Sequence, residues 1–216
     1  IDIKYVKGNN QVDYNILKSK DSDFKNSTFK LEDGIFNCVM EQEKMSKSMF
    51  NVVNPDEICD KYGADTLRMY EMFLGPIEQS KPWDTRGISG VHSFLKKFWG
   101  LFFKDGLINV SEEDPSNESL KSLHKTIKKI TEDIEKLSLN TCISSFMICI
   151  NELSSMKCNN REILKDLLIL ISPFAPHFAE ELWSQLGHKV SIIDQVYPDY
   201  NEKYLVETEK LYPVSF

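Results

Sequence analysis

Apolar residues recur at helical spacing through most of the chain after residue 84. Ile88, Val91, Leu95, Phe98 and Phe102 follow one another in steps of three and four residues, so they lie on one face of a helix. Two more such stripes occupy residues 120–137 and 143–153, and further helices are expected at 161–171 and 176–186. Short connections between amphipathic helices favour antiparallel neighbours. The pattern predicts a mainly α fold centred on an antiparallel helix bundle.

Capping residues mark where several helices begin and end. Asn54-Pro55 is typical of a helix start, and Gly63 would end that helix. A second helix is expected from about residue 64 to 73, with Asp65 near its positive end. Further on, Asn140 is expected to cap the helix that carries the 143–153 stripe. Residues 104–116, rich in polar residues, are expected to form a loop.

The first forty-odd residues show a different pattern. Ile1, Ile3 and Tyr5 alternate with polar residues, and apolar positions return on both sides of Asp33-Gly34. Residues 18–28 are polar and are expected to be a loop. We therefore predict a small β-rich segment over residues 1–43. At the other end, residues 211–216 are typical of a strand, and both ends suggest a piece of a longer protein.

Composition narrows the class of protein. The net charge is -7, from 26 basic and 33 acidic residues, which argues against a non-specific nucleic-acid binder but allows a local basic face. Five cysteines without a Cys-x-x-Cys pair are typical of free thiols in a reducing cytosol. The four histidines are isolated, so no zinc pattern is present. No apolar run is long enough to span a membrane.

The clearest candidate for chemistry is the run Lys44, Met45, Ser46, Lys47 and Ser48. Two ammonium groups on flexible stems and two small hydroxyl side chains suit a loop that closes over a nucleoside triphosphate. Such cations stabilise the negative charge that grows as a phosphorus–oxygen bond breaks. The alternative is an ordinary exposed loop of lysines and serines.

A second candidate is a basic strip on the expected helix that carries the 120–137 stripe. Lys121, Lys125 and Lys128 recur at steps of four and three, with Lys129 beside them. Lys96 and Lys97 form a similar group earlier in the chain. Each set is either a solvated helix face or a contact for an RNA backbone, which would make binding salt-dependent.

Several motifs together resemble the leucine branch of the class I aminoacyl-tRNA synthetases. Residues 44–48 match the second signature of that class, and residues 51–56 and 61–68 match its sequel. The stretches 72–76 and 87–95, with Trp83 between them, are similar to the leucine branch in particular. Residues 173–183 resemble the last helices of the anticodon-binding domain of the family.

The resemblance implies a layout and a role for each part. Residues 1–43 would end a leucine-specific insertion, 44–83 would hold the signature loop and linking helices, 84–187 the anticodon-binding bundle, and 188–216 a tail leading to a further domain. The parent enzyme would be a cytoplasmic ligase that uses ATP, with Mg²⁺, and passes leucine to tRNA(Leu). Lys47 would stabilise the leaving pyrophosphate, assisted by Lys44, while Met45, Ser46 and Ser48 shape the ATP-binding loop.

Two departures from the family pattern bear on activity. Leucine enzymes often have lysine after the signature, whereas this chain has Met49, so one positive charge is missing. No His-x-Gly-His signature is present either, and the leucine pocket would lie upstream. We therefore expect the chain alone to be inactive. The alternatives are a non-catalytic helical tRNA-binding module, or the equivalent part of an isoleucine or valine enzyme.

Overall fold

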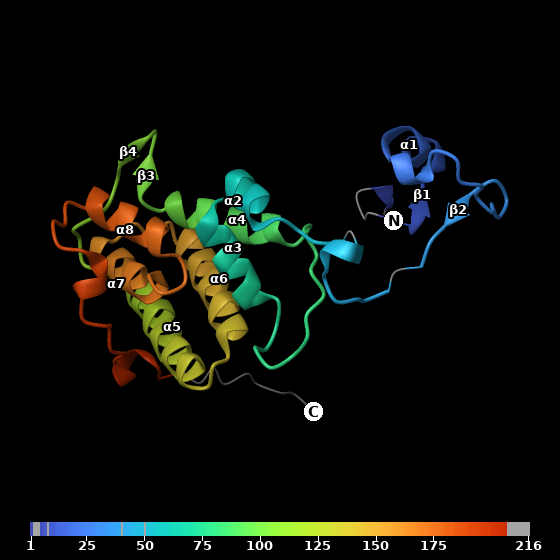
Figure 1. Cartoon of the computed structure of the whole chain (residues 1–216). Coiled ribbons are helices and arrows are strands. Elements are labelled where there is room, and N and C mark those ends of the chain that lie inside the picture. The colour runs from blue at the N-terminus through green and yellow to red at the C-terminus, as the bar shows by residue number, and fades with distance from the viewer. Residues whose placement is uncertain (2–4, 8, 40, 50, 207–216) are drawn as a thin grey trace, which may run out of the picture. The chain divides into compact units, whose positions relative to one another are not determined.

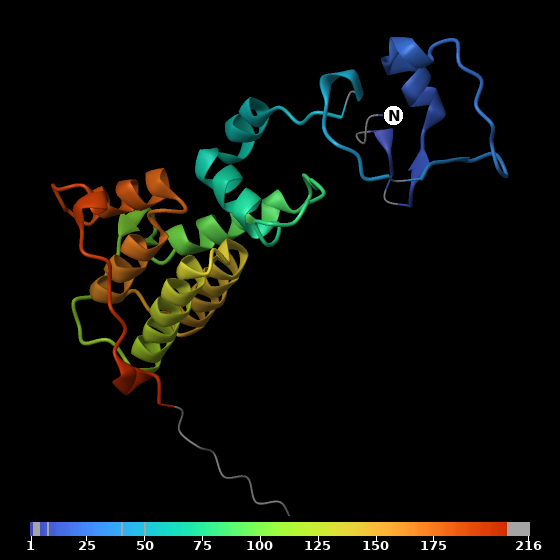
Figure 2. The ribbon, with the colours of Figure 1, turned by 60° about the horizontal axis from the view of Figure 1, so that its bottom comes forward.

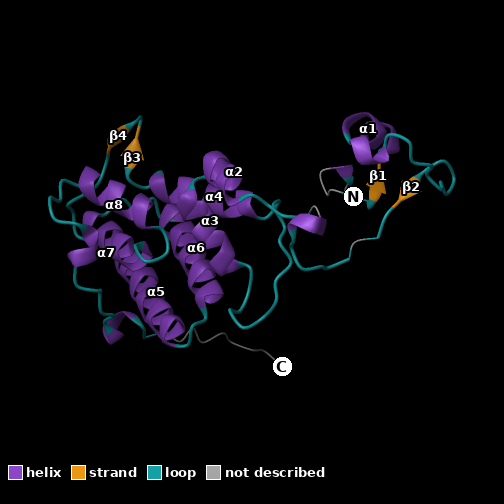
Figure 3. Cartoon of the chain, viewed as in Figure 1, coloured by secondary structure: helices purple, strands orange, loops and turns teal. Residues whose placement is uncertain are grey.

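The computed structural model describes residues 1, 5–7, 9–39, 41–49 and 51–206. The chain forms two compact units, Ile1–Asn54 and Pro55–Phe216. Helices dominate the second unit, and strands are short in both (Figure 3). The predicted mainly α fold is confirmed. The strand expected at 211–216 lies outside the described residues, as does Ile3 of the first expected strand.

The first unit contains a helix that the sequence interpretation missed. Strand β1 (Gln11–Val12) pairs antiparallel with β2 (Phe36–Asn37), and helix α1 (Tyr14–Lys20) follows β1 directly. Asp13 caps α1 by accepting hydrogen bonds from the N–H groups of Asn15 and Ile16. The loop expected over 18–28 was wrong at its start, because this cap and the fully buried Leu17 hold the polar residues around them in a helix.

Phe29 gives the first unit a small aromatic cluster. Its ring centroid lies 4.9 Å from that of Phe36 and 5.9 Å from that of Tyr14, so α1 and β2 pack against the same side chain. Such pairs add to the free energy of folding beyond the area that they bury. The cluster connects segments that lie far apart along this part of the chain.

The second unit is a set of packed helices (Figure 1). They are α2 (Pro55–Tyr62), α3 (Ala64–Phe73), α4 (Ile88–Trp99), α5 (Asn117–Glu135), α6 (Leu139–Ser155), α7 (Arg161–Ile171) and α8 (Pro176–Gln185). Helices α5 and α6 lie side by side in both views, and the turn 136–138 makes them antiparallel (Figures 1 and 2). The apolar stripe of α4 is confirmed, since Ile88, Val91 and Phe98 are fully buried.

Two local predictions in this unit were wrong. Asn140 does not cap α6 but lies inside it, and Ser138 occupies the cap position. Leu137 adopts a positive φ of 55° and is 57% exposed, so the chain turns two residues earlier than expected. The loop expected at 104–116 begins instead as a hairpin of β3 (Phe103–Lys104) and β4 (Leu107–Ile108). Asp105-Gly106 supplies the two positive φ angles that a tight hairpin turn requires.

Candidate functional site

The signature loop presents its two lysines to solvent. Lys44 and Lys47 are exposed, whereas Ser46 between them is half-buried. A 3₁₀ turn over Lys47–Met49 follows, and the N–H of Met49 donates to the carbonyl of Ser46 at 3.1 Å. The hydroxyls of Ser46 and Ser48 lie 3.2 Å apart and share a hydrogen bond. The serines therefore hold the loop's bend, and the two ammonium groups remain available for a ligand.

Neither lysine is neutralised by a carboxylate within the described part of the chain. Met49 is exposed as well, so an apolar side chain follows the signature directly. Over the same residues, no group of three or more His, Cys, Asp or Glu side chains is placed to hold a metal ion. The loop thus presents two exposed cations.

The lysines of the α5 strip differ in their surroundings. Lys129 donates to Asp133 at 2.6 Å, an ion pair within the helix. Lys125 is exposed, while Lys121 and Lys128 are half-buried. The segment 200–204, which we call the strap, packs against α5, and its Tyr200 ring lies near Nζ of Lys128. Two lysines of the strip are therefore exposed to solvent, and two are partly covered.

The strap is held to α5 by aromatic and polar contacts. The rings of His124 and Tyr204 stack at 4.7 Å with an angle of 3° between their planes. The N–H of Asn201 donates to Nδ1 of His124 at 3.3 Å, and Nζ of Lys128 lies 5.5 Å from the centre of the Tyr200 ring. Burial lowers the pKa of His124, which favours the neutral ring that this hydrogen bond requires.

Lys96 and Lys97 occupy another helix, α4, and both are exposed. Nζ of Lys97 donates to Oδ1 of Asn151 on α6 at 2.7 Å. Lys96 borders a groove of about 390 Å³ whose other walls come from the start of α3 and the start of α8. The two lysines thus differ: one bridges two helices, and the other lines a cavity with His92 and His177.

Asp65 lies in the first turn of α3, as expected, but its side chain caps a different helix. Its Oδ2 accepts from the N–H of Phe178 at 2.6 Å and its Oδ1 lies 2.9 Å from Nδ1 of His177. The side chain is buried and caps α8, not its own helix. Nearby, Arg68 donates to the carbonyl of Pro173 at 3.0 Å. The stretches 61–68 and 173–183, far apart in sequence, therefore meet in the fold.

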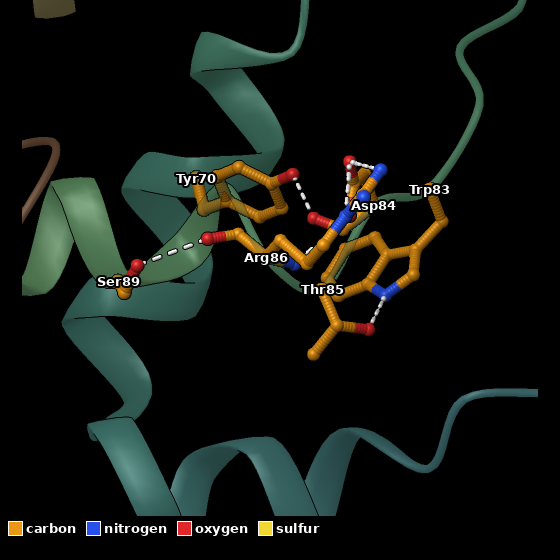
Figure 4. A network of polar contacts seen from close by, with 6 residues as sticks. All are labelled: Tyr70, Trp83, Asp84, Thr85, Arg86 and Ser89. Carbon is orange, nitrogen blue, oxygen red and sulfur yellow. Dashed lines mark hydrogen bonds and ion pairs between the residues drawn. The ribbon is translucent and has the colours of Figure 1, made fainter. Parts of the chain in front are cut away.

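A polar turn connects α3 to the start of α4 (Figure 4). The hydroxyl of Tyr70 donates to the carbonyl of Asp84, and the ring of Trp83 packs edge-on against Tyr70 at 5.3 Å. Arg86 pairs with Asp84, and Ser89 donates to the carbonyl of Arg86 at 2.9 Å. Burial and the nearby Asp84 raise the pKa of Tyr70, so the phenol stays protonated and remains a donor.

Gly87 is required by this turn for space, and replacing it by alanine is expected to destabilise the fold. A Cβ atom at Gly87 would lie 2.7 Å from the hydroxyl of Tyr70, although the backbone there is helical and unstrained. Overpacking of this kind costs about 1–3 kcal/mol. Thermal unfolding of Gly87→Ala measures the loss. Gly90→Ala is the matched control, because its Cβ would meet nothing within 4 Å and should stabilise α4 slightly. Equal melting temperatures for the two variants would contradict the steric explanation.

Two family models and several curated proteins match this chain. Residues 33–84 match the family model described as tRNA synthetases class I (I, L, M and V), and residues 117–214 match the anticodon-binding domain of tRNA ligase. The chain is 57% identical over its whole length to a leucine–tRNA ligase of Christiangramia forsetii, covering 22% of that protein. It is 62% identical over 90% of its length to one of Flavobacterium psychrophilum, covering 20% of that protein.

A solved structure shares the arrangement of the elements. A LeuRS from Agrobacterium radiobacter K84, described as a ternary complex with tRNA and LeuAMS, superposes with a TM-score of 0.65 at 28% sequence identity. The match covers 76% of this chain and 23% of that one. The chain thus spans between a fifth and a quarter of the length of the relatives that it matches.

Proposed function

The chain belongs to the leucine–tRNA ligase family of the class I tRNA synthetases, and on that premise we propose that it supplies two parts of such an enzyme. One part is a loop that contacts ATP during leucine activation. The other is a helical domain that binds tRNA(Leu). The observation that carries the first role is the pair of exposed lysines, Lys44 and Lys47, on a loop whose bend is held by its own serines.

The proposed chemistry joins leucine to the α-phosphate of ATP and releases pyrophosphate. The carboxylate oxygen of leucine forms a bond to the α-phosphorus while the bond to the bridging oxygen breaks, and negative charge gathers on the leaving group. Lys47 stabilises that charge, and Lys44 assists. Mg²⁺ would arrive with the phosphates of ATP, and Met45, Ser46 and Ser48 shape the loop. The leucyl group then passes to the terminal adenosine of tRNA(Leu).

For tRNA binding, we propose that the α5 strip and the strap form one surface. Lys121, Lys125 and Lys128 lie along the helix, and Tyr200 and Tyr204 of the strap lie against the same face. Cations contact phosphates, and aromatic rings beside them exclude water from the contact. The family match over 117–214 spans both segments and supports this assignment. Lys129 contributes less, because Asp133 already neutralises it, and Lys96 and Lys97 would form a second contact on α4.

Salt dependence tests the tRNA surface. Replacing Lys121, Lys125 and Lys128 by glutamine in the full-length enzyme should weaken tRNA(Leu) binding and reduce the slope of log Kd against log salt by roughly two to three units, since each phosphate contact contributes about 0.7–0.9. Filter binding between 50 and 300 mM salt measures the slope. The control replaces Lys20, Lys25 and Lys30, which are exposed in the first unit and change the net charge equally. If both triple variants behave alike, the strip is only a solvated face.

The alternatives predict different behaviour. A non-catalytic tRNA-binding module would bind tRNA as the isolated chain and would need no upstream domain. The equivalent segment of an isoleucine or valine enzyme is disfavoured by relatives that are named leucine–tRNA ligase and are 57% and 62% identical to this chain. We propose that the chain alone does not activate leucine, because the His-x-Gly-His signature is not in it.

Its five free thiols fit a cytoplasmic location. The described helices include none long and apolar enough to cross a membrane.

A further inference from the structure

We propose that Asn51 is a positioning residue for the signature loop, acting through Lys44 and Lys47 without touching substrate. The inference rests on the proposed function, since it assigns Asn51 a role in the same ATP-contacting loop. Asn51 follows the signature by three positions and has no charge of its own to offer ATP. Its importance comes from what its side chain does to the loop backbone.

The side-chain amide of Asn51 closes the loop with two hydrogen bonds. Its Oδ1 accepts from the N–H of Ser46 at 2.9 Å, and its Nδ2 donates to the carbonyl of Lys44 at 3.4 Å. Both partners are backbone groups, so this pair of hydrogen bonds, which we call the clip, does not engage the lysine side chains. The amide of Asn51, at the end of the loop, is therefore bonded both to Lys44 at its start and to Ser46 in its middle.

The clip completes the loop's internal structure. Between Lys44 and Asn51 the described bonds are the turn from Met49 to the carbonyl of Ser46 and the contact of the two serine hydroxyls, and both involve Ser46. Asn51 binds the N–H of that same residue. Ser46 is thus held from its N–H, its carbonyl and its hydroxyl, while the lysines on either side stay exposed. Fixing Ser46 fixes the directions in which Lys44 and Lys47 leave the backbone.

Asparagine suits this role because of its chemistry. A single side chain must accept from one backbone group and donate to another, and aspartate at neutral pH has no donor. Alanine loses both bonds, and glutamine carries the amide one methylene further from the backbone. Because both bonds are exposed to solvent, each contributes little to global stability. Their loss should therefore affect the position of the cations and leave the fold intact.

The expected effect appears in turnover. Catalysis by placed charges is sensitive to geometry, and a misplacement of about 1 Å can cost roughly 100-fold in rate. In the full-length enzyme, Asn51→Ala should lower kcat for leucine-dependent ATP–pyrophosphate exchange by roughly 10- to 100-fold. KM for leucine and the melting temperature should stay unchanged. Asn51→Asp, which keeps the acceptor for Ser46, should fall between Ala and the native residue. The matched control is Asn37→Ala, which removes a surface amide whose bond goes to Glu32.

A double-mutant cycle separates positioning from an independent role. If Asn51 acts through the two lysines, then Asn51→Ala should cost much less in a Lys47→Ala background than in the native enzyme, because only its effect on Lys44 remains. Multiplicative losses would overturn the proposal, and so would a native kcat for Asn51→Ala. A native kcat for Lys47→Ala would instead refute the proposed function of the loop, which keeps the two failures distinguishable.

Proteolysis gives a second readout that does not depend on activity. Trypsin cleaves after Lys44 and Lys47, and a clipped loop fits a protease site poorly. Asn51→Ala should raise the cleavage rate at these two bonds severalfold in the full-length enzyme, whereas Asn37→Ala should not. Unchanged cleavage of Asn51→Ala would show that the amide does not hold the loop and would contradict the proposal.

Discussion

Lys47→Ala in the full-length enzyme is expected to lower kcat for leucine-dependent ATP–pyrophosphate exchange by roughly 100- to 1,000-fold, the range found when one preorganised donor to a developing charge is removed. The side chain is exposed on a loop shaped by its own hydrogen bonds, so truncation removes a cation without disturbing a core. KM for leucine should hardly change, because the charge on pyrophosphate grows in the transition state and not on leucine binding.

Three controls sharpen that experiment. Lys30→Ala removes an exposed lysine from the same unit and should leave turnover unchanged. Lys47→Arg keeps the charge but replaces a compact ammonium by a planar fork, so it should recover activity only partly. The isolated 216-residue chain should show no leucine-dependent exchange at all. A Lys47→Ala enzyme with native turnover would refute the assigned role, and exchange by the isolated chain would refute the need for an upstream domain.

The second large effect concerns stability. Asp65→Ala is expected to destabilise the helical unit by about 2–4 kcal/mol, because it removes a helix cap and a charge-assisted hydrogen bond in a buried position. The N–H of Phe178 would lose its partner at the start of α8, and His177 would lose its link to α3. Asp65→Asn keeps an acceptor and should lose about half as much.

Urea unfolding followed by tryptophan fluorescence measures this loss, since Trp99 and Trp183 lie in the same unit. The matched control is Asp60→Ala, an exposed carboxylate on the neighbouring helix α2. The midpoint of Asp65→Ala should fall well below that of the control, with an unchanged slope. Equal midpoints would mean that the carboxylate does not hold α8 to α3.

Much of the helical fold could be predicted from local pattern. The α4 stripe is buried as expected, α3 has the predicted bounds, and Gly63 separates α2 from α3 with a φ of 87°. These features depend on side-chain periodicity and on the conformational freedom of glycine. Both can be recognised from residues that lie close together in the sequence. The predictions failed where local signals compete. Asn140 is a good cap residue, yet the turn closes earlier, since the N–H of Ser138 donates to the carbonyl of Asp133.

The sequence by itself determined the family, the cationic loop and the set of amphipathic helices, because motif spacing and side-chain periodicity are local properties. Only the tertiary structure decided which distant groups meet. It placed the carboxylate of Asp65 at the start of α8, packed the strap against His124 and Lys128 of α5, and directed the amide of Asn51 to the loop backbone. A polar side chain can satisfy its hydrogen bonds with many partners, and packing selects one of them.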